Sequence, residues 1–147
     1  MAAVIVRPGQ GETLNVLGMP LRFLCDAESD GAWSLMEEEI GLGQGPAPHR
    51  HDWDEAYFVI DGALDFEIDG KPTRLGAREF AYLPRNTVHG FKGASQSPTH
   101  VLIFAVPAHS SAFFRDVNRE VLKIPDDLRK LPAIGQRHGI EFMPPRA

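Results

Sequence analysis

The chain has 147 residues, enough for one ordinary domain with its own hydrophobic core. A formal net charge of -5 at pH 7, a pI near 5.6 and the lack of any Lys or Arg block argue against a nucleic-acid-binding surface. The single cysteine, Cys25, excludes an intrachain disulfide, so we expect a cytoplasmic protein. The longest apolar run, Val101–Val106, is too short to span a bilayer, and Met1–Gly9 lacks the long apolar stretch of a signal peptide.

Short apolar segments separated by turn residues fill the chain up to Pro107. Many short strands of this kind predict an all-β sandwich or barrel. The expected strands are Thr13–Leu17, Leu21–Asp26, Trp33–Leu42, Glu55–Ile60, Ala63–Ile68, Thr73–Leu75, Phe80–Leu83, Thr87–Phe91 and His100–Val106. Two dipeptides, Asp61-Gly62 and Asp69-Gly70, are typical of two-residue hairpin turns.

The strand that begins at Glu55 is apolar on both faces. One face carries Glu55, Tyr57 and Val59, and the other carries Ala56, Phe58 and Ile60. A strand at a solvated surface has only one apolar face, so the second needs a cover. Either the C-terminal segment or a second subunit could supply this cover. If a second copy of the chain supplies it, the protein is a homodimer.

The pattern becomes helical after Pro107. Ser110 or Ser111 can cap a helix whose apolar residues recur at helical spacing, namely Phe113, Phe114, Val117 and Val121. A second helix is expected between Pro125 and Gly139, kinked or shortened by Pro132, and Ile140–Phe142 is expected to be extended. Since no linker interrupts the chain, we expect one domain over residues 1–147, with a barrel over about 12–107 and a helical tail over about 108–147.

Three polar residues in the middle of the chain have the spacing of a metal site. His49, His51 and Glu55 are all odd-numbered, so in an extended segment their side chains point to one face. Two imidazoles and a carboxylate on one face can bind a divalent transition metal. A fourth ligand, His89, would join them if a second strand packs opposite.

The same residues carry a family resemblance. The spacing Gly43-(five residues)-His49-x-His51-(three)-Glu55-(six)-Gly62 matches the first cupin motif at each required position. Pro84 and His89 are in register with the second motif, where Arg78, Asn86 and Gly93 replace the usual Gly, Gly and Asn without removing a ligand. The chain therefore resembles the cupins. The segment Gly31–Leu35 and the tail are also similar to bacterial quercetin dioxygenase-like cupins.

This resemblance implies a double-stranded β-helix, or jelly roll, that holds one divalent transition metal per chain. By position the ligands would be His49, His51, Glu55 and His89, and the ion would be Fe, Mn, Ni, Co, Cu or Zn. The resemblance also implies a homodimer. Quercetin dioxygenases bind their substrate as an enolate that reacts with O2, so Glu55 has two open roles here, ligand only or ligand and general base.

Four apolar residues are expected to line a substrate pocket. They are Tyr57, Val59, Phe66 and Phe91, for which barrel filling is the alternative. With no Arg or Lys cluster on the ligand face, this lining favours an apolar substrate over a phosphorylated one.

The remaining polar and reactive residues receive other expectations. We expect Trp53 in a loop or at the rim, and His109 and His138 at the surface. We expect Glu37–Glu39 to face solvent or a subunit interface, and the alternative is that one of them is a carboxylate in the pocket. His100 begins an apolar strand near the expected barrel end, and a position in the pocket or beside the ligands is the alternative. Cys25 and Ser110-Ser111 lack a His or Asp partner for nucleophilic catalysis.

Three functions remain open. The first is a metal-dependent dioxygenase, a quercetinase-like oxidoreductase, that acts on a small aromatic or enolisable substrate with O2. The second is an isomerase, decarboxylase or lyase that uses the metal as a Lewis acid. The third is a non-catalytic cupin that binds a small molecule. A DNA-binding regulator is not expected, because no helix-turn-helix segment precedes the expected barrel.

Overall fold

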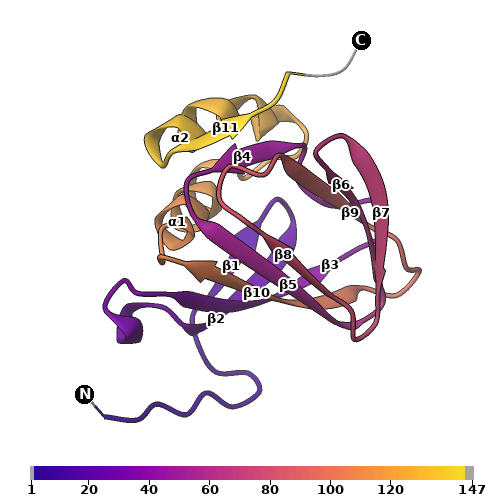
Figure 1. The fold of residues 1–147 in the computed structure, drawn as a ribbon. Helices are drawn as coiled ribbons and strands as arrows, with labels where there is room; N and C mark the ends of the chain where they lie inside the picture. The colour runs from indigo at the N-terminus through magenta and orange to yellow at the C-terminus, as the bar shows by residue number, and fades with distance from the viewer. Residues whose placement is uncertain (1, 145–147) are drawn as a thin grey trace.

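The structure is a computed structural model, and it describes residues 2–144. Two antiparallel sheets face each other, and the C-terminal segment lies across one end of them (Figure 1). The strands are β1 Thr13–Val16, β2 Met19–Cys25, β3 Ser34–Ile40, β4 His49–His51, β5 Asp54–Asp61, β6 Ala63–Ile68, β7 Lys71–Gly76, β8 Phe80–Leu83, β9 His89–Gly93, β10 Thr99–Val106 and β11 Ile140–Phe142. The helices are α1 Ser110–Glu120 and α2 Leu131–Arg137, with short 3-10 helices at Ala27–Ser29 and Asp126–Lys130.

The strand order shows how the chain alternates between the two sheets. The larger sheet runs β1-β2-β3-β10-β5-β8, and the smaller sheet runs β11-β4-β9-β6-β7. Strand β10 lies between β3 and β5, and β9 lies between β4 and β6, so strands distant in sequence become neighbours. This interleaving is the jelly-roll arrangement. The predicted all-β fold is therefore confirmed, as two facing sheets rather than a closed barrel.

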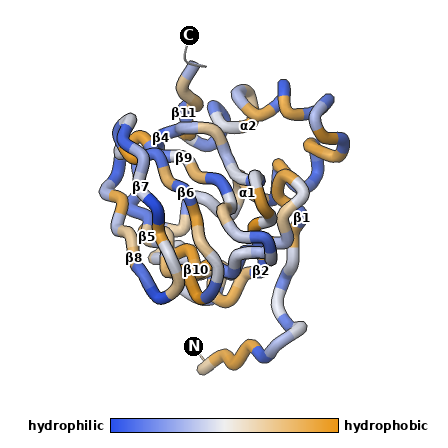
Figure 2. The backbone as a smooth tube through the Cα atoms, turned by 90° about the vertical axis from the view of Figure 1, so that its right-hand side faces the viewer, coloured by the Kyte–Doolittle hydropathy of each residue, from blue (hydrophilic) through white to orange (hydrophobic). Residues whose placement is uncertain are grey.

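Alternation along the strands places the apolar core between the sheets. In β5, Glu55, Tyr57 and Val59 are buried, whereas Phe58 and Ile60 are exposed, as the face assignment predicts. Figure 2 shows hydrophobic and hydrophilic residues alternating along the chain in both sheets. The inner faces thus supply a common interior, into which any inward-pointing polar side chain must fit.

The two predicted hairpin turns differ in what they connect. Asp69 and Gly70, with φ of 48° and 81°, join β6 to β7 in a tight antiparallel hairpin, as predicted. The prediction for Asp61-Gly62 is wrong, because β5 belongs to the larger sheet and β6 to the smaller one. The chain changes sheets there, and Thr99 leaves no room for a side chain at Gly62.

The C-terminal tail forms the predicted helices and packs onto both sheets. Helix α1 contacts β1, while β11 pairs with β4 through Ile140 and His51, which extends the smaller sheet by one strand. Pro132 lies in the first turn of α2, so it starts that helix instead of kinking a longer one. No helix within residues 2–144 is long and apolar enough to cross a membrane.

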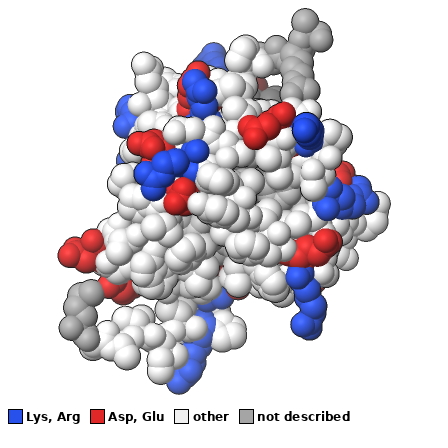
Figure 3. Space-filling model, viewed as in Figure 1, with Lys and Arg blue, Asp and Glu red and all other residues white. Residues whose placement is uncertain are grey.

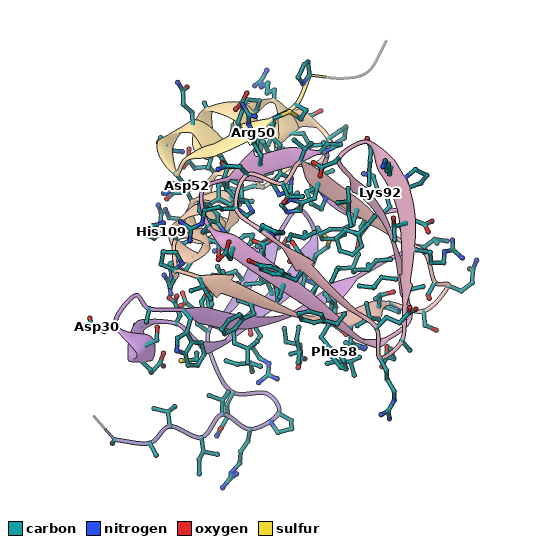
Figure 4. The ribbon with its side chains drawn as sticks, in the orientation of Figure 1. Asp30, Arg50, Asp52, Phe58, Lys92 and His109 are labelled. Atoms are coloured by element: carbon teal, nitrogen blue, oxygen red, sulfur yellow. The ribbon has the colours of Figure 1, made fainter. Side chains whose placement is uncertain are left out.

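The tail, as far as residue 144, leaves the outer face of the larger sheet uncovered. Large apolar side chains with 37% or more of their surface exposed gather over its strands and the adjoining loop, namely Trp33, Phe58, Ile60, Phe80, Tyr82 and Phe104. Phe58 lies on the outer side of the strands in Figure 4, and Figure 3 shows few charged side chains over β5 and β8. Of the two covers that the sequence allowed for this face, the tail is not the one used.

Candidate metal centre

The candidate ligands come from both sheets. Strand β4 turns His49 and His51 inward and Arg50 outward, where Arg50 pairs with Glu141 of β11 at 2.8 Å (Figure 4). The expectation of one continuous ligand strand is wrong, because Glu55 lies on β5 in the opposite sheet. The chain crosses between the sheets at residues 52 and 53. Consequently His51 and Glu55 meet across the interior, each pointing inward from its own sheet.

His89 completes the set from β9. It is the register partner of His49 in the antiparallel β4–β9 pair, so the two rings lie side by side with centroids 4.5 Å apart. The three imidazoles of His49, His51 and His89 are all buried, and their ligand nitrogens lie within 4.8 Å of one another. The fold therefore brings together the histidines that lie 40 residues apart in sequence.

Backbone carbonyl groups orient all three rings. The Nδ1 atoms of His49, His51 and His89 lie 2.8, 3.2 and 2.9 Å from the carbonyl oxygens of Ala47, Trp53 and Thr87. Because a carbonyl only accepts, each Nδ1 carries the proton and each Nε2 of a neutral ring keeps its lone pair. The buried Nε2 atoms of His51 and His89 have no hydrogen-bond partner within residues 2–144. This arrangement is the one that metal-binding histidines require.

Glu55 lies between two of the imidazoles. Its oxygens are 3.4 Å from Nε2 of His51 and 3.3 Å from Nε2 of His89, without the directionality of hydrogen bonds. Tyr57 donates a short hydrogen bond to one carboxylate oxygen, and the indole N–H of Trp53 donates to the other at 3.4 Å. Burial favours the neutral acid, but the two neighbouring imidazoles outweigh it and hold the pKa of Glu55 well below its usual value.

Burial and neighbouring charges shift the pKa values of His49 and His89 in opposite directions. Burial, reinforced by His89, lowers the pKa of His49 to about 4, so this ring is neutral at pH 7. Burial opposes charge on His89 as well, but the Glu55 carboxylate outweighs it and raises the pKa of His89. The same burial, together with Glu55, raises the pKa of Tyr57 well above its usual value, which keeps the phenol a hydrogen-bond donor. A metal ion binds only the neutral form of His89, so it would compete with a proton for this ring.

A cavity of about 60 Å³ adjoins this cluster. Its wall includes His49, His51 and Glu55, the sequence-predicted residues Tyr57 and Phe91, and an apolar set from the tail and the first hairpin: Val16, Leu17, Met19, Phe113, Phe114, Val117, Leu131, Ile140 and Phe142. The tail side chains were not expected there. Helix α1, which contacts β1, carries Phe113, Phe114 and Val117 to the wall. The pairing of β11 with β4 sets the Phe142 ring 5.6 Å from that of His49.

Two of the predicted pocket residues lie in the core instead of on the cavity wall. Val59 is fully buried, and Phe66 is 2% exposed and packs edge-on against Tyr57, with ring centroids 5.2 Å apart. Phe66 also supports Phe91 at 5.4 Å. Their inward direction is as predicted, but strand alternation does not tell how far along the interior the cavity extends.

Trp53 lies in the loop between β4 and β5, one of the two predicted positions, but it is buried and not at the rim. It is 2% exposed, lines the cavity and stacks on His51 with centroids 4.0 Å apart and ring planes 7° from parallel. The two flanking acidic residues led to the loop prediction, yet the indole turns inward at the sheet crossing. It therefore restrains one candidate ligand by stacking and the carboxylate of Glu55 by hydrogen bonding.

The other sequence candidates lie away from the cluster. His109 is exposed, as expected, while His138 is partly buried and contacts Asp116 at 2.6 Å. His100 bridges Glu39 and Asp61 on the outer face of the larger sheet.

The acidic triplet in β3 divides between the two faces of the sheet. Glu37 and Glu39 point outward and pair with Arg22 and His100, respectively. Glu38 points inward, is 3% exposed and lines the cavity. Burial, with a smaller contribution from the Glu55 charge, raises the pKa of Glu38 to about 8. The interior thus contains a second carboxyl group, in the alternative position that the sequence left open.

Comparison with known proteins identifies the family to which this fold is related. Residues 36–105, just under half of the chain, match the family model for the cupin domain. The chain carries a cupin domain. All four candidate ligands lie inside the matched segment of this cupin, on β4, β5 and β9.

Individual relatives are distant. Quercetin 2,3-dioxygenase of Bacillus subtilis (strain 168) is 26% identical over 114 residues, covering 76% of this chain and 33% of that protein. The cupin chain thus spans about a third of that relative's length. Similar solved structures include the polyketide cyclase RemF from Streptomyces resistomycificus (TM-score 0.63, 20% identity, 71% of this chain and 80% of that one). A predicted oxalate decarboxylase from Thermotoga maritima is also similar (TM-score 0.63, 17% identity, 71% and 99%).

Burial of Glu38 predicts a specific pH dependence of stability. Its pKa is about 4.5 in the unfolded chain and about 8 when folded, so its proton stabilises the fold fully below pH 4.5 and this stabilisation is lost as the pH rises towards 8. In chelator-treated protein, we expect the free energy of unfolding of the wild type to fall by roughly 4 kcal/mol relative to Glu38→Gln between pH 5 and pH 8. Denaturant titrations at several pH values measure this difference.

Glu38→Leu is the control, because it also lacks the titrating group and should follow Glu38→Gln with a constant offset. Parallel pH curves for wild type and both variants would contradict a neutral buried Glu38.

Proposed function

We propose that this cupin is an enzyme in which His49, His51, His89 and Glu55 hold one divalent transition metal. The observation that carries the proposal is the set of three buried imidazoles, each fixed through Nδ1 by a backbone carbonyl and converging within 4.8 Å. Three imidazoles and a carboxylate suit Fe, Mn, Ni, Co, Cu or Zn. When bound, such an ion supplies Lewis acidity and open coordination positions for a substrate.

The reaction that we propose is dioxygenase-like oxidation of a small aromatic or enolisable molecule. The sequence similarity to a quercetin 2,3-dioxygenase supports it, and so does the presence of a candidate general base, Glu55, on the cavity wall. Glu55 stays ionised at neutral pH and is held by Tyr57 and Trp53, so its oxygens are positioned to accept a proton from a substrate hydroxyl.

The cavity wall supports a small, apolar substrate. No Arg or Lys of residues 2–144 belongs to that wall, which disfavours phosphorylated or multiply charged substrates. The cavity of about 60 Å³ is well below the several hundred Å³ typical of sites for drug-sized ligands, so a small open-chain or single-ring compound suits it better than a flavonol does.

A second candidate is an isomerase, decarboxylase or lyase that needs no O2. The contact between Tyr57 and Glu55 favours it, because the pair provides a donor and an acceptor for moving a proton within one substrate. Turnover under strictly anaerobic conditions separates the two candidates. Binding without any product would indicate a non-catalytic cupin.

We also propose a homodimer formed through the outer face of the larger sheet. The exposed apolar side chains of that face include Phe58, Phe80 and Phe104, and the ion pairs of His100 and Arg22 lie at its edge. Apolar patches of this kind are unusual on monomers and common at interfaces between subunits.

Removing two imidazoles tests the metal site. Protein purified without chelator should carry close to one divalent ion per chain, whereas His49→Ala combined with His51→Ala should carry almost none, because a site with one imidazole binds first-row metals weakly. Elemental analysis measures the content. The control is His109→Ala with His100→Ala, which removes two histidines outside the cluster and should keep the ion. Equal metal content in both double variants would refute the assignment.

Substitution of Glu55 separates its two roles. We expect Glu55→Gln to abolish O2 consumption with enolisable aromatic compounds in an oxygen electrode, a loss of at least about a hundredfold for a general base. If Glu55→Gln keeps its metal but loses turnover, Glu55 is the general base. If the variant loses its metal, Glu55 is a metal ligand. Glu39→Gln, on the outer face, is the matched control. Normal turnover of Glu55→Gln would show that neither role is essential.

The dimer has its own test. Phe58→Glu should shift the molar mass measured by light scattering from two chains to one, because a carboxylate in an apolar interface is expensive to desolvate. Lys71→Glu, a charge change on the edge strand β7, is the control and should leave the mass unchanged. A wild-type mass equal to one chain would rule out the dimer.

A further inference from the structure

Glu38 is the one carboxyl group of the cavity wall that has no partner in the described part of the chain. It sits in the middle of β3 between Leu21 of β2 and Val101 of β10, both fully buried apolar residues. No hydrogen bond or ion pair from residues 2–144 reaches its carboxyl group, in contrast to Glu55. Burying an unpaired carboxyl group is unfavourable, so a purely structural role at this position would be better served by an apolar side chain.

The chemical form of Glu38 defines what it can bind. A neutral carboxyl group offers one O–H donor and keeps acceptor capacity on its carbonyl oxygen. Burial raises the pKa of Glu38 to about 8, so the neutral form predominates at pH 7. Such a group binds a ketone or hydroxyl oxygen well, whereas an anionic group on a ligand would gain less from it and would meet the charge of Glu55.

A second unsatisfied polar atom lies on the same cavity wall. Ser110, at the first position of α1, is 1% exposed, and its Oγ atom has no hydrogen-bond partner within residues 2–144. The wall also carries apolar side chains, among them Met19, Ile103 and Phe113. Besides the histidine cluster with Glu55, the cavity wall therefore carries two polar groups without a hydrogen-bond partner within residues 2–144, the carboxyl group of Glu38 and the hydroxyl group of Ser110.

We propose that Glu38 is a substrate-binding residue that donates a hydrogen bond to a second oxygen of the substrate, apart from the oxygens held at the histidine cluster. This role rests on the proposed function, since it needs a substrate anchored at His49, His51, His89 and Glu55. The substrate class that follows is an uncharged molecule with an enolisable or chelating head and a carbonyl or hydroxyl oxygen at its far end.

A matched pair of ligands tests this role. Butyrylacetone and diacetylacetone have the same diketone head and the same chain length, but only diacetylacetone has a further carbonyl at the far end. Their affinities for Zn²⁺-loaded protein are measured by calorimetry for wild type, Glu38→Leu and Glu38→Gln. Because the intrinsic difference between the two ligands is common to all three proteins, the change in their affinity ratio isolates the contribution of residue 38.

We expect the preference for diacetylacetone to fall roughly five- to tenfold in Glu38→Leu, the loss of one hydrogen bond, and to persist in Glu38→Gln, whose amide still donates. Butyrylacetone should bind all three proteins equally, which shows that the variants keep their fold and their metal. The infrared spectrum of metal-free wild type at neutral pH should contain a protonated-carboxyl band that both variants lack.

The outcomes separate this role from the proposed function. If butyrylacetone binds but the affinity ratio is the same in Glu38→Leu, the role of Glu38 is overturned and the metal centre stands. If neither ligand binds the wild type, both are overturned. Absence of the protonated-carboxyl band also overturns the role of Glu38, because an ionised group has no proton to donate.

Discussion

The polar side chains buried inside this cupin need hydrogen-bond or metal partners, and the centre of the molecule is organised around that requirement. Three imidazoles and the carboxylate of Glu55 face a mainly apolar interior, where an isolated charge is strongly disfavoured. Backbone carbonyls bind the Nδ1 side of each ring, and Tyr57 and Trp53 bind the carboxylate. The Nε2 atoms of His51 and His89 remain unsatisfied, and the proposed divalent cation is the group that would satisfy them.

The fold meets this requirement by crossing between its sheets inside the ligand sequence. His51 ends β4 in the smaller sheet, and Glu55 is the second residue of β5 in the larger one, so the chain crosses the interior at residues 52 and 53. Strand β11 then pairs with β4 and carries Phe142 to the cavity. The tail therefore both supports the strand that holds two ligands and closes the cavity. Changes in the tail could alter the substrate without touching the ligands, as is common when one fold hosts several activities.

Much of this arrangement can be predicted from the sequence wherever the two-residue alternation of a strand determines the direction of a side chain. The alternation along β5 gives the correct inner and outer residues, because each position has one of two directions. The histidine spacing, read with the cupin resemblance, gives the residues that meet at the cluster. The change of sheet at Gly62 could not be predicted, because Asp-Gly serves equally in a hairpin and in a crossing between sheets.

Features that depend on long-range register were also beyond the sequence. Strand β4 has only three residues, too few for the alternation of buried and exposed positions to mark its end, so the sequence predicts one extended segment that carries all three ligands. Glu38 was one of three adjacent glutamates, and only its register with Leu21 and Val101 places it inside. Phe142 of the tail reaches the cavity through the pairing of β11 with β4, which joins segments that lie far apart in sequence.

The occupancy of the histidine cluster tests the central claim most directly. Anomalous X-ray diffraction from crystals of protein purified without chelator would locate a transition metal and identify its element by the absorption edge. We predict one strong peak per chain at about 2.0–2.2 Å from nitrogen atoms of His49, His51 and His89. An intact cluster without an anomalous peak, in protein that also fails to take up added Fe²⁺, Mn²⁺, Ni²⁺, Co²⁺, Cu²⁺ or Zn²⁺, would contradict it.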